Sequence, residues 1–173
     1  MSKYDWLKNE VPLPKTVLEG LKELGTVETA GSGNTPKIMK WAAETGLSST
    51  YSADSIPWCG LFAAVIVKRA GKSIVASPLW AKSWANFGTA VSKPGLGDIL
   101  VFSRNGGGHV GFYVAEDATA YHVLGGNQSD SVSITRIAKN RLFAARRPNY
   151  TNKPASVKPF TVSGTGALST NES

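Results

Sequence analysis

The sequence predicts an α+β domain in which helices occupy the first half of the chain and strands the second. Between residues 14 and 87, apolar residues recur at the three- and four-residue spacing of amphipathic helices. After the turn dipeptide Pro94-Gly95, short alternating runs separated by tight turns favour an antiparallel sheet. With 173 residues, of which 42% are hydrophobic, the chain is long enough for one domain with a substantial core.

Each expected helix is followed by a glycine, the residue that most easily adopts the left-handed conformation of a helix C-cap. Proline stands near the start of three of them, where its missing N–H has no helical partner. The expected helices cover residues 14–24, 36–45, 57–70 and 79–87, after a short helical turn over residues 4–8. The expected strands cover residues 98–103, 109–115, 120–124, 131–137 and 142–146.

The only cysteine of the chain lies in the first turn of the third expected helix, two residues after Pro57. Free N–H groups and the positive end of the helix dipole favour a thiolate at Cys59. Such a thiolate is a ready nucleophile. The alternative is a small buried side chain, which is the commonest role of a lone cysteine in an apolar run.

A histidine at the start of a strand supplies the second group that a cysteine hydrolase needs. His109 follows a glycine loop, and a strand packed against the helix would bring its imidazole to the thiol. A third group should orient the ring, and Asn127 and His122 are the candidates. All three residues also have a structural interpretation. His109 would be a strand-end histidine, Asn127 a turn residue and His122 an edge histidine facing water.

Four motifs in this order resemble the cysteine, histidine-dependent amidohydrolase/peptidase (CHAP) family, within the wider papain-like NlpC/P60 group. They are Pro57-Trp-Cys-Gly-Leu-Phe, Gly97-Asp-Ile-Leu-Val-Phe, Gly108-His-Val-Gly-Phe-Tyr-Val and Leu124-Gly-Gly-Asn-Gln-Ser-Asp. The similarity spans residues 13–148 and is greatest to phage and prophage wall hydrolases. It implies a papain-like fold, with the nucleophile at a helix N-terminus packed on a small antiparallel sheet of about five strands.

The resemblance also implies roles for individual residues. Cys59 matches the nucleophile, His109 the general base and Asn127 the polar residue that follows the histidine strand. Asp98 belongs to a Gly-Asp-Ile motif that ties down a strand start. Asp54, five residues before the cysteine, is a weaker candidate that would organise the cleft or a loop.

The chain departs from the family pattern at two places. Many CHAP enzymes carry a glutamate two residues before the asparagine, where this chain has Gly125. NlpC/P60 enzymes place a third histidine about a dozen residues after the catalytic one, so His122 is the second candidate for the third catalytic residue. Some relatives bind calcium, but no loop here has the necessary carboxylate density. Neither C-x-x-C nor H-E-x-x-H occurs, so we expect no metal and no cofactor.

The expected activity is hydrolysis of a peptidoglycan amide through a cysteine thiolate and a thioester. The bond is either the N-acetylmuramoyl-L-alanine amide or one within the stem peptide and its crosslinks. The setting would be a phage endolysin or a tail-associated lysin. Alternatives are a non-catalytic structural or wall-binding phage tail component, and a wall-degrading toxin delivered by a secretion system.

Charge and the chain ends shape the expected partners. The net charge of +7 favours an anionic partner such as the cell wall, and gives no reason to expect specific nucleic-acid binding.

The longest apolar run, residues 61–67, is too short to span a membrane. Residues 1–12 lack a signal peptide, so we expect synthesis in the cytoplasm and action on the wall in the periplasm, after release during lysis or from a virion. Residues 149–173 have the composition of a polar, low-complexity tail, suited to docking on other virion proteins.

Overall fold

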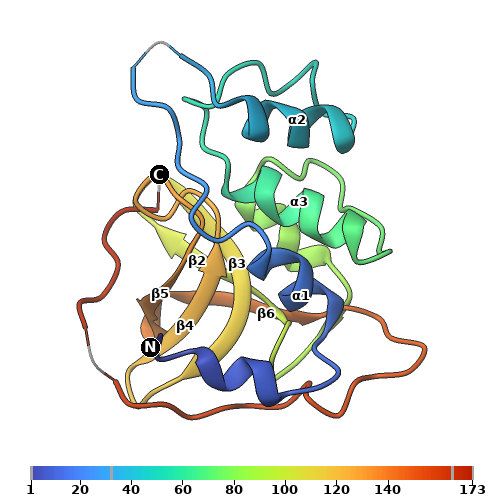
Figure 1. Cartoon of the computed structure of the whole chain (residues 1–173), viewed down its shortest axis with the longest axis vertical. Coiled ribbons are helices and arrows are strands. Elements are labelled where there is room, and N and C mark those ends of the chain that lie inside the picture. The colour runs from blue at the N-terminus through green and yellow to red at the C-terminus, as the bar shows by residue number, and fades with distance from the viewer. Residues whose placement is uncertain (1, 32, 165, 173) are drawn as a thin grey trace.

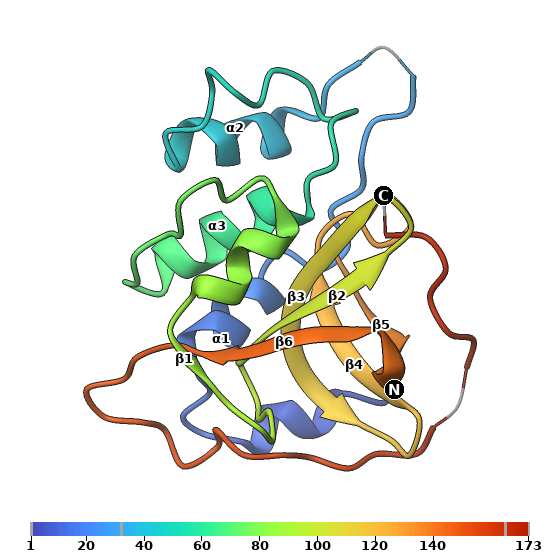
Figure 2. The ribbon, with the colours of Figure 1, turned by 180° about the vertical axis from the view of Figure 1, so that it is seen from behind.

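A computed structural model describes residues 2–31, 33–164 and 166–172. In these described residues, helices cover one face of a six-stranded antiparallel sheet. Helix α3 lies between α2 and the sheet (Figures 1 and 2). The helices are η1 (Asp5–Asn9), α1 (Lys15–Leu21), α2 (Pro36–Glu44), α3 (Cys59–Arg69), η2 (Ala81–Asn86) and η3 (Lys139–Arg141). The strands are β1 (Thr89–Ala90), β2 (Ile99–Arg104), β3 (Gly107–Glu116), β4 (Ala120–Gly125), β5 (Ser133–Ala138) and β6 (Leu142–Arg147).

The sheet confirms the α+β class and the five expected strands. Its order is β1-β6-β2-β3-β4-β5, and the additional strand β1 is only two residues long, too short to show alternation. One detail differs from expectation: the glycines before His109 are not all loop. Gly107 already pairs with Arg104, so that Asn105 and Gly106 form a two-residue turn with Gly106 at a φ of +80°.

Helix α3 is the centre of the hydrophobic core. Every residue from Cys59 to Val67 is buried, and the side chains of Val110 and Phe112 on β3 belong to the same cluster. Burial of each large apolar side chain stabilises the fold by about 1.5–3 kcal/mol. The helix that carries the cysteine is therefore buried along most of its length.

The ends of α3 correct one expectation and confirm another. The helix begins at Cys59 with Trp58 as its N-cap, so Pro57 precedes the first turn instead of lying in it. At the other end the chain forms a Schellman motif, as Gly71 predicts. The Gly71 N–H donates to the Lys68 carbonyl at 2.9 Å, and the Lys72 N–H donates to the Val67 carbonyl at 3.0 Å.

Two other helices are shorter than expected. Helix α1 ends at Leu21 although Leu24 keeps the apolar spacing, and the Leu24 side chain is 44% exposed. The fourth expected helix is the 3₁₀ helix η2, which covers Ala81–Asn86 only. The expected turn over residues 4–8 is the 3₁₀ helix η1.

The segment after Pro148 does not lie free in solvent, contrary to the expectation of a solvated tail. Figure 2 shows it running around the outside of the domain from β6. Val157 is buried, the Phe160 ring lies 4.7 Å from the Trp6 ring, and Leu168 forms a β-bridge with Arg136. Its few apolar residues find partners, and its backbone bonds to strand edges, which composition alone does not reveal. The expected boundaries after residues 12 and 148 stay predictions, and no helix in the described ranges is long and apolar enough to cross a membrane.

Asp98 has the structural role that its motif implies. Its fully buried carboxylate accepts hydrogen bonds from Arg147 Nε at 3.0 Å and Nη2 at 2.8 Å, and from the Gly95 N–H at 2.8 Å. These contacts join the start of β2 to the end of β6. They also satisfy a charge that could not otherwise be buried.

We predict that Asp98→Ala lowers the free energy of unfolding by about 3 kcal/mol, because it leaves Arg147 without its buried partner. Urea unfolding followed by circular dichroism measures this. Glu19→Gln, which removes the surface ion pair with Lys22, is the control and should cost less than about 1 kcal/mol. Equal losses in the two variants would contradict the structural role of Asp98.

Candidate active site

Cys59 lies against β3, the strand that carries His109. Cys59 is the first residue of α3, and the backbone N–H of Val110, directly after His109 in β3, donates toward the thiol. Cys59 is only 3% exposed and His109 is fully buried. The start of α3 thus contacts β3 at the residue directly after His109.

Two glycines let neighbouring loops lie close to the first turns of α3. A Cβ on Gly60 would lie 2.2 Å from the Pro78 carbonyl oxygen, and a Cβ on Gly126 would lie 2.6 Å from Phe62 Cβ. Both distances are too short for real atoms. Any larger residue would therefore push the neighbouring loops away from the first turns of α3.

Gln128 is the residue that orients His109, and the sequence analysis did not identify it. His109 Nε2 lies 3.0 Å from Gln128 Oε1. The amide nitrogen of Gln128 donates to the Val123 and Ser133 carbonyls at 3.2 and 2.8 Å, which fixes the orientation of the amide. Since Oε1 can only accept, His109 Nε2 carries the proton and Nδ1 presents a lone pair. That Nδ1 is buried and has no hydrogen-bond partner.

Gly125 makes room for this arrangement. A Cβ there would lie 2.5 Å from Gln128 Oε1 and 3.3 Å from His109 Nε2. A side chain at position 125, where many CHAP enzymes have a glutamate, would therefore prevent Gln128 from reaching His109. The available signal was the glutamine in Gly-Gly-Asn-Gln, three residues after that glycine.

Asn127 does not take the position expected of the third catalytic residue. It has a φ of +58°, and its buried Oδ1 has no hydrogen-bond partner. The residue that hydrogen-bonds His109 is the next one in the chain, Gln128. Asn127 instead lines a cavity on the other side of the loop, together with Asp54.

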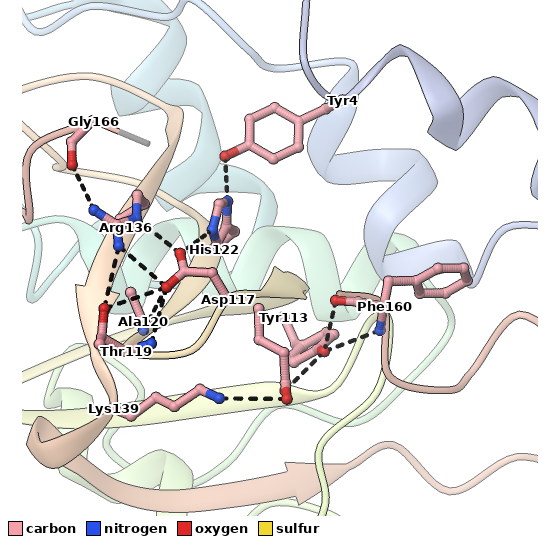
Figure 3. A network of polar contacts seen from close by, with 11 residues as sticks. Tyr4, Tyr113, Asp117, Thr119, Ala120, His122, Arg136, Lys139, Phe160 and Gly166 are labelled. Carbon is pink, nitrogen blue, oxygen red and sulfur yellow. Dashed lines mark hydrogen bonds and ion pairs between the residues drawn. The ribbon is translucent and has the colours of Figure 1, made fainter. Parts of the chain in front are cut away.

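His122, the second candidate, belongs to a separate polar network (Figure 3). Its Nε2 lies 2.7 Å from Asp117 Oδ2 and its Nδ1 lies 2.7 Å from the Tyr4 hydroxyl, while Arg136 donates to the same carboxylate. His122 pairs with Ala115, six residues along β3 from His109, which separates the two histidines by about 20 Å. His122 is fully buried, so the expectation of an edge histidine facing water is also wrong.

Asp54 organises a loop beside the site. The Thr35 N–H donates to its carboxylate, and the Asp54 N–H donates to Asn34 Oδ1 at 3.3 Å. These bonds tie residues 34–35 to the segment that leads into α3. In the described residues, no three carboxylate, imidazole or thiol groups are arranged to hold a metal ion.

Burial makes the resting dyad a neutral pair. It raises the pKa of the Cys59 thiol, although the N–H groups of Val110 and Gly60 and the charge of Arg104 act in the opposite direction. Burial also lowers the pKa of His109 to about 4. Burial therefore disfavours the resting thiolate that the helix N-terminus led us to expect, because desolvation outweighs the helix N-terminus.

A charged cavity of about 610 Å³ adjoins the dyad, and the C-terminal segment forms one of its walls. Arg104, Arg141 and Glu172 line it, and all three interact electrostatically with His109. Glu172 pairs with Arg141 and accepts a hydrogen bond from the Ser169 hydroxyl at 2.7 Å. Ser169 and Glu172 belong to the segment whose composition predicted a tail, so the sequence did not predict their position near His109.

We predict that Gln128→Ala slows alkylation of Cys59 by iodoacetamide about 10- to 100-fold, because the His109 ring then loses the hydrogen bond that fixes its tautomer and orientation, which a general base for the thiol requires. Mass spectrometry of the intact protein at neutral pH measures the rate. Ser133→Ala is the matched control: it removes one acceptor of the Gln128 amide nitrogen and leaves Oε1 in place. A folded Gln128→Ala protein that reacts at the wild-type rate would contradict the assignment.

We also predict that stability falls as the pH is lowered from 7 to 4.5. The pKa of His109 is about 4 in the folded state and about 6.5 when unfolded. Its contribution is therefore complete above pH 6.5 and is lost as the pH falls toward 4, by about 2–3 kcal/mol. Urea midpoints across this range measure the loss, and His109→Gln should flatten it. A profile equally steep in the variant would assign the loss to other groups.

Comparison of the chain with protein-family models and with curated proteins finds no match. The chemistry of the site is therefore read from its geometry. A buried thiol at a helix N-terminus, an imidazole with a free Nδ1 and a glutamine that fixes the tautomer are together equipped for nucleophilic acyl transfer.

Proposed function

We propose that this chain is a cysteine hydrolase that cleaves an amide bond of peptidoglycan. The observations that support the proposal are the Cys59 thiol next to the Val110 N–H, and the unpartnered Nδ1 of His109, the residue before Val110, with Gln128 at the opposite ring nitrogen. A histidine serving only the fold would be expected to satisfy both ring nitrogens when buried. His122 does so.

The chemistry follows from the protonation states. As the Cys59 sulfur attacks the amide carbonyl, the thiol proton moves to His109 Nδ1, and Gln128 Oε1 stabilises the imidazolium through Nε2–H. The negative charge on the substrate oxygen would be met by the free N–H of Cys59 at the first turn of α3. Loss of one donor of this kind costs on the order of 3 kcal/mol.

The second half of the cycle uses the same proton. His109 Nδ1–H protonates the departing amine, which leaves a thioester on Cys59. The neutral imidazole then takes a proton from water as the water attacks the thioester carbonyl. Collapse releases the carboxylic acid and returns the proton to sulfur, so the dyad ends as the neutral pair from which it began.

Charge supports a wall substrate. The net charge of +7 concentrates the protein on an anionic polymer, and Arg104 and Arg141 give the adjoining cavity two cations that suit a peptide carboxylate. The resemblance to phage and prophage wall hydrolases supports an endolysin or a tail-associated lysin as the setting. A papain-like arrangement of helix and sheet is part of the same proposal.

We predict that wild-type protein releases fragments from purified Gram-negative peptidoglycan and that Cys59→Ala lowers the rate by at least about 10³-fold. Mass spectrometry of the fragments distinguishes muramoyl-amide cleavage from cleavage within the stem peptide. Cys59→Ser, which keeps size and polarity but loses the thiol, should be nearly as inactive. Digestion by Cys59→Ala at the wild-type rate would overturn the thiol mechanism, and no release by wild type from sacculi of either diamino-acid type would overturn the wall substrate.

A further inference from the structure

The Cys59 thiol and the His109 imidazole are closed off from solvent. Cys59 is only 3% exposed and His109 is fully buried. An amide carbon must come within about 3.5 Å of the sulfur before it can react, so part of the protein must move to admit a wall peptide. Movement of α3 would be unfavourable, because it would expose the core side chains from Leu61 to Val67. A segment outside the core is the better candidate.

Residues 166–172, which we call the C-terminal strap, lie outside the core. Glu172 is buried and Ser169 is half-buried, while the other strap residues are exposed. None of the described residues 166–172 belongs to a hydrophobic core cluster. In both views the strap ends beside the turn between β2 and β3 (Figures 1 and 2). The strap can therefore exchange its polar contacts without unpacking the core.

One end of the strap is fixed to β5, which is the edge strand of the sheet. Arg136 of β5 forms a β-bridge with Leu168, and its carbonyl accepts the Ser169 N–H at 2.7 Å. The Arg136 guanidinium donates to the Gly166 carbonyl and pairs with Asp117 (Figure 3). Arg136 is therefore an anchor from which the rest of the strap can open.

The other end of the strap bonds the loop that orients His109. The Ser129 N–H donates to the Asn171 carbonyl at 2.9 Å. Ser129 directly follows Gln128, whose Oε1 lies 3.0 Å from His109 Nε2. The strap thus contacts the backbone next to the residue that holds the imidazole.

Glu172 connects the strap to the opposite side of His109. Its carboxylate pairs with Arg141, and Arg141 Nε donates to the Ser103 carbonyl at 3.2 Å. Ser103 belongs to β2 and pairs with Gly108, the residue before His109. The charge of Glu172 also acts on the imidazole itself, since it raises the pKa of His109 against the effect of burial. The strap therefore holds a carboxylate close to the site.

A substrate carboxylate would compete with Glu172 for the same arginine. Arg104 and Arg141 line the charged cavity of about 610 Å³ together with Glu172. In the proposed function, these two arginines bind a peptide carboxylate, which forms the same charge-assisted hydrogen bonds as Glu172. Substrate entry and release of the strap are therefore coupled.

We propose that residues 166–172 form an autoinhibitory strap, which the pairing of Glu172 with Arg141 closes over the approach to Cys59 and His109 and which opens from its Arg136 anchor to admit substrate. The inference rests on the proposed hydrolase function. It adds how access to that site is regulated, and by which residues.

The rate of Cys59 alkylation by iodoacetamide in the full chain measures access to the thiol, whatever the substrate is. Glu172→Gln keeps the size of the side chain but removes the charge that pairs with Arg141. We expect it to speed alkylation at neutral pH about tenfold, because a charge-assisted hydrogen bond that holds the strap closed is lost.

The direction of this change separates access from electrostatics. The Glu172 carboxylate raises the pKa of His109, so its loss alone would make the imidazole a weaker base. Alkylation would then become slower instead of faster. Slower alkylation of Glu172→Gln would therefore overturn the strap and leave Glu172 as an electrostatic partner of His109. An unchanged rate would overturn the strap as well.

A second variant tests the strap without removing a charge. Ser169→Pro deletes the N–H that the Arg136 carbonyl accepts, and it should also speed alkylation. Glu19→Gln, which removes the surface ion pair with Lys22, is the matched control and should react at the wild-type rate. Circular dichroism checks that each variant is folded, and Glu172→Gln decides alone if Ser169→Pro is not.

Digestion of peptidoglycan separates the strap from the hydrolase. Faster alkylation of both strap variants, with no cleavage by any form of the protein, would leave the strap standing and overturn the proposed function. Cys59-dependent cleavage by the wild type, with the wild-type alkylation rate in Glu172→Gln, would keep the hydrolase and overturn the strap.

Discussion

The site depends on the contact between the first turn of α3 and the start of β3. The Val110 N–H reaches the Cys59 thiol there, and Gly60 and Gly126 let the neighbouring loops lie directly on the helix. The same helix is buried along most of its length, so the core and the candidate nucleophile share one element. A substitution that loosens this contact would affect stability and chemistry together, because no flexible loop separates them.

The fold was largely predictable because its signals are local. Helical spacing, strand alternation and the glycine after α3 identified the elements, and Asp98 identified a strand start that Arg147 anchors. The failures came from effects that depend on the rest of the chain. Helix α1 ends early despite continued apolar spacing, and the C-terminal segment packs on the domain through backbone bonds to strand edges. Composition carries no information about such pairing.

The candidate site was predicted in part. Cys59 and His109 were placed correctly at a helix start and near a strand start, because both element starts are visible in the sequence. The hydrogen-bond partner of His109 is Gln128, one position after the residue that the sequence suggested. The difference depends on the left-handed conformation of Asn127, which the sequence alone does not reveal. The protonation states could not be predicted either. They depend on how deeply the dyad is buried, and that depth is set by the packing of distant segments.

Gly125 has a consequence for how the surroundings of His109 are compared with those of other proteins. Gly125 contributes no side chain, and a glutamine three residues later reaches back to the imidazole nitrogen. The polar partner of the histidine therefore comes from a different position of the loop. A comparison that scores residues column by column would record only a missing polar side chain at Gly125. A comparison of atoms around the imidazole would also find the glutamine.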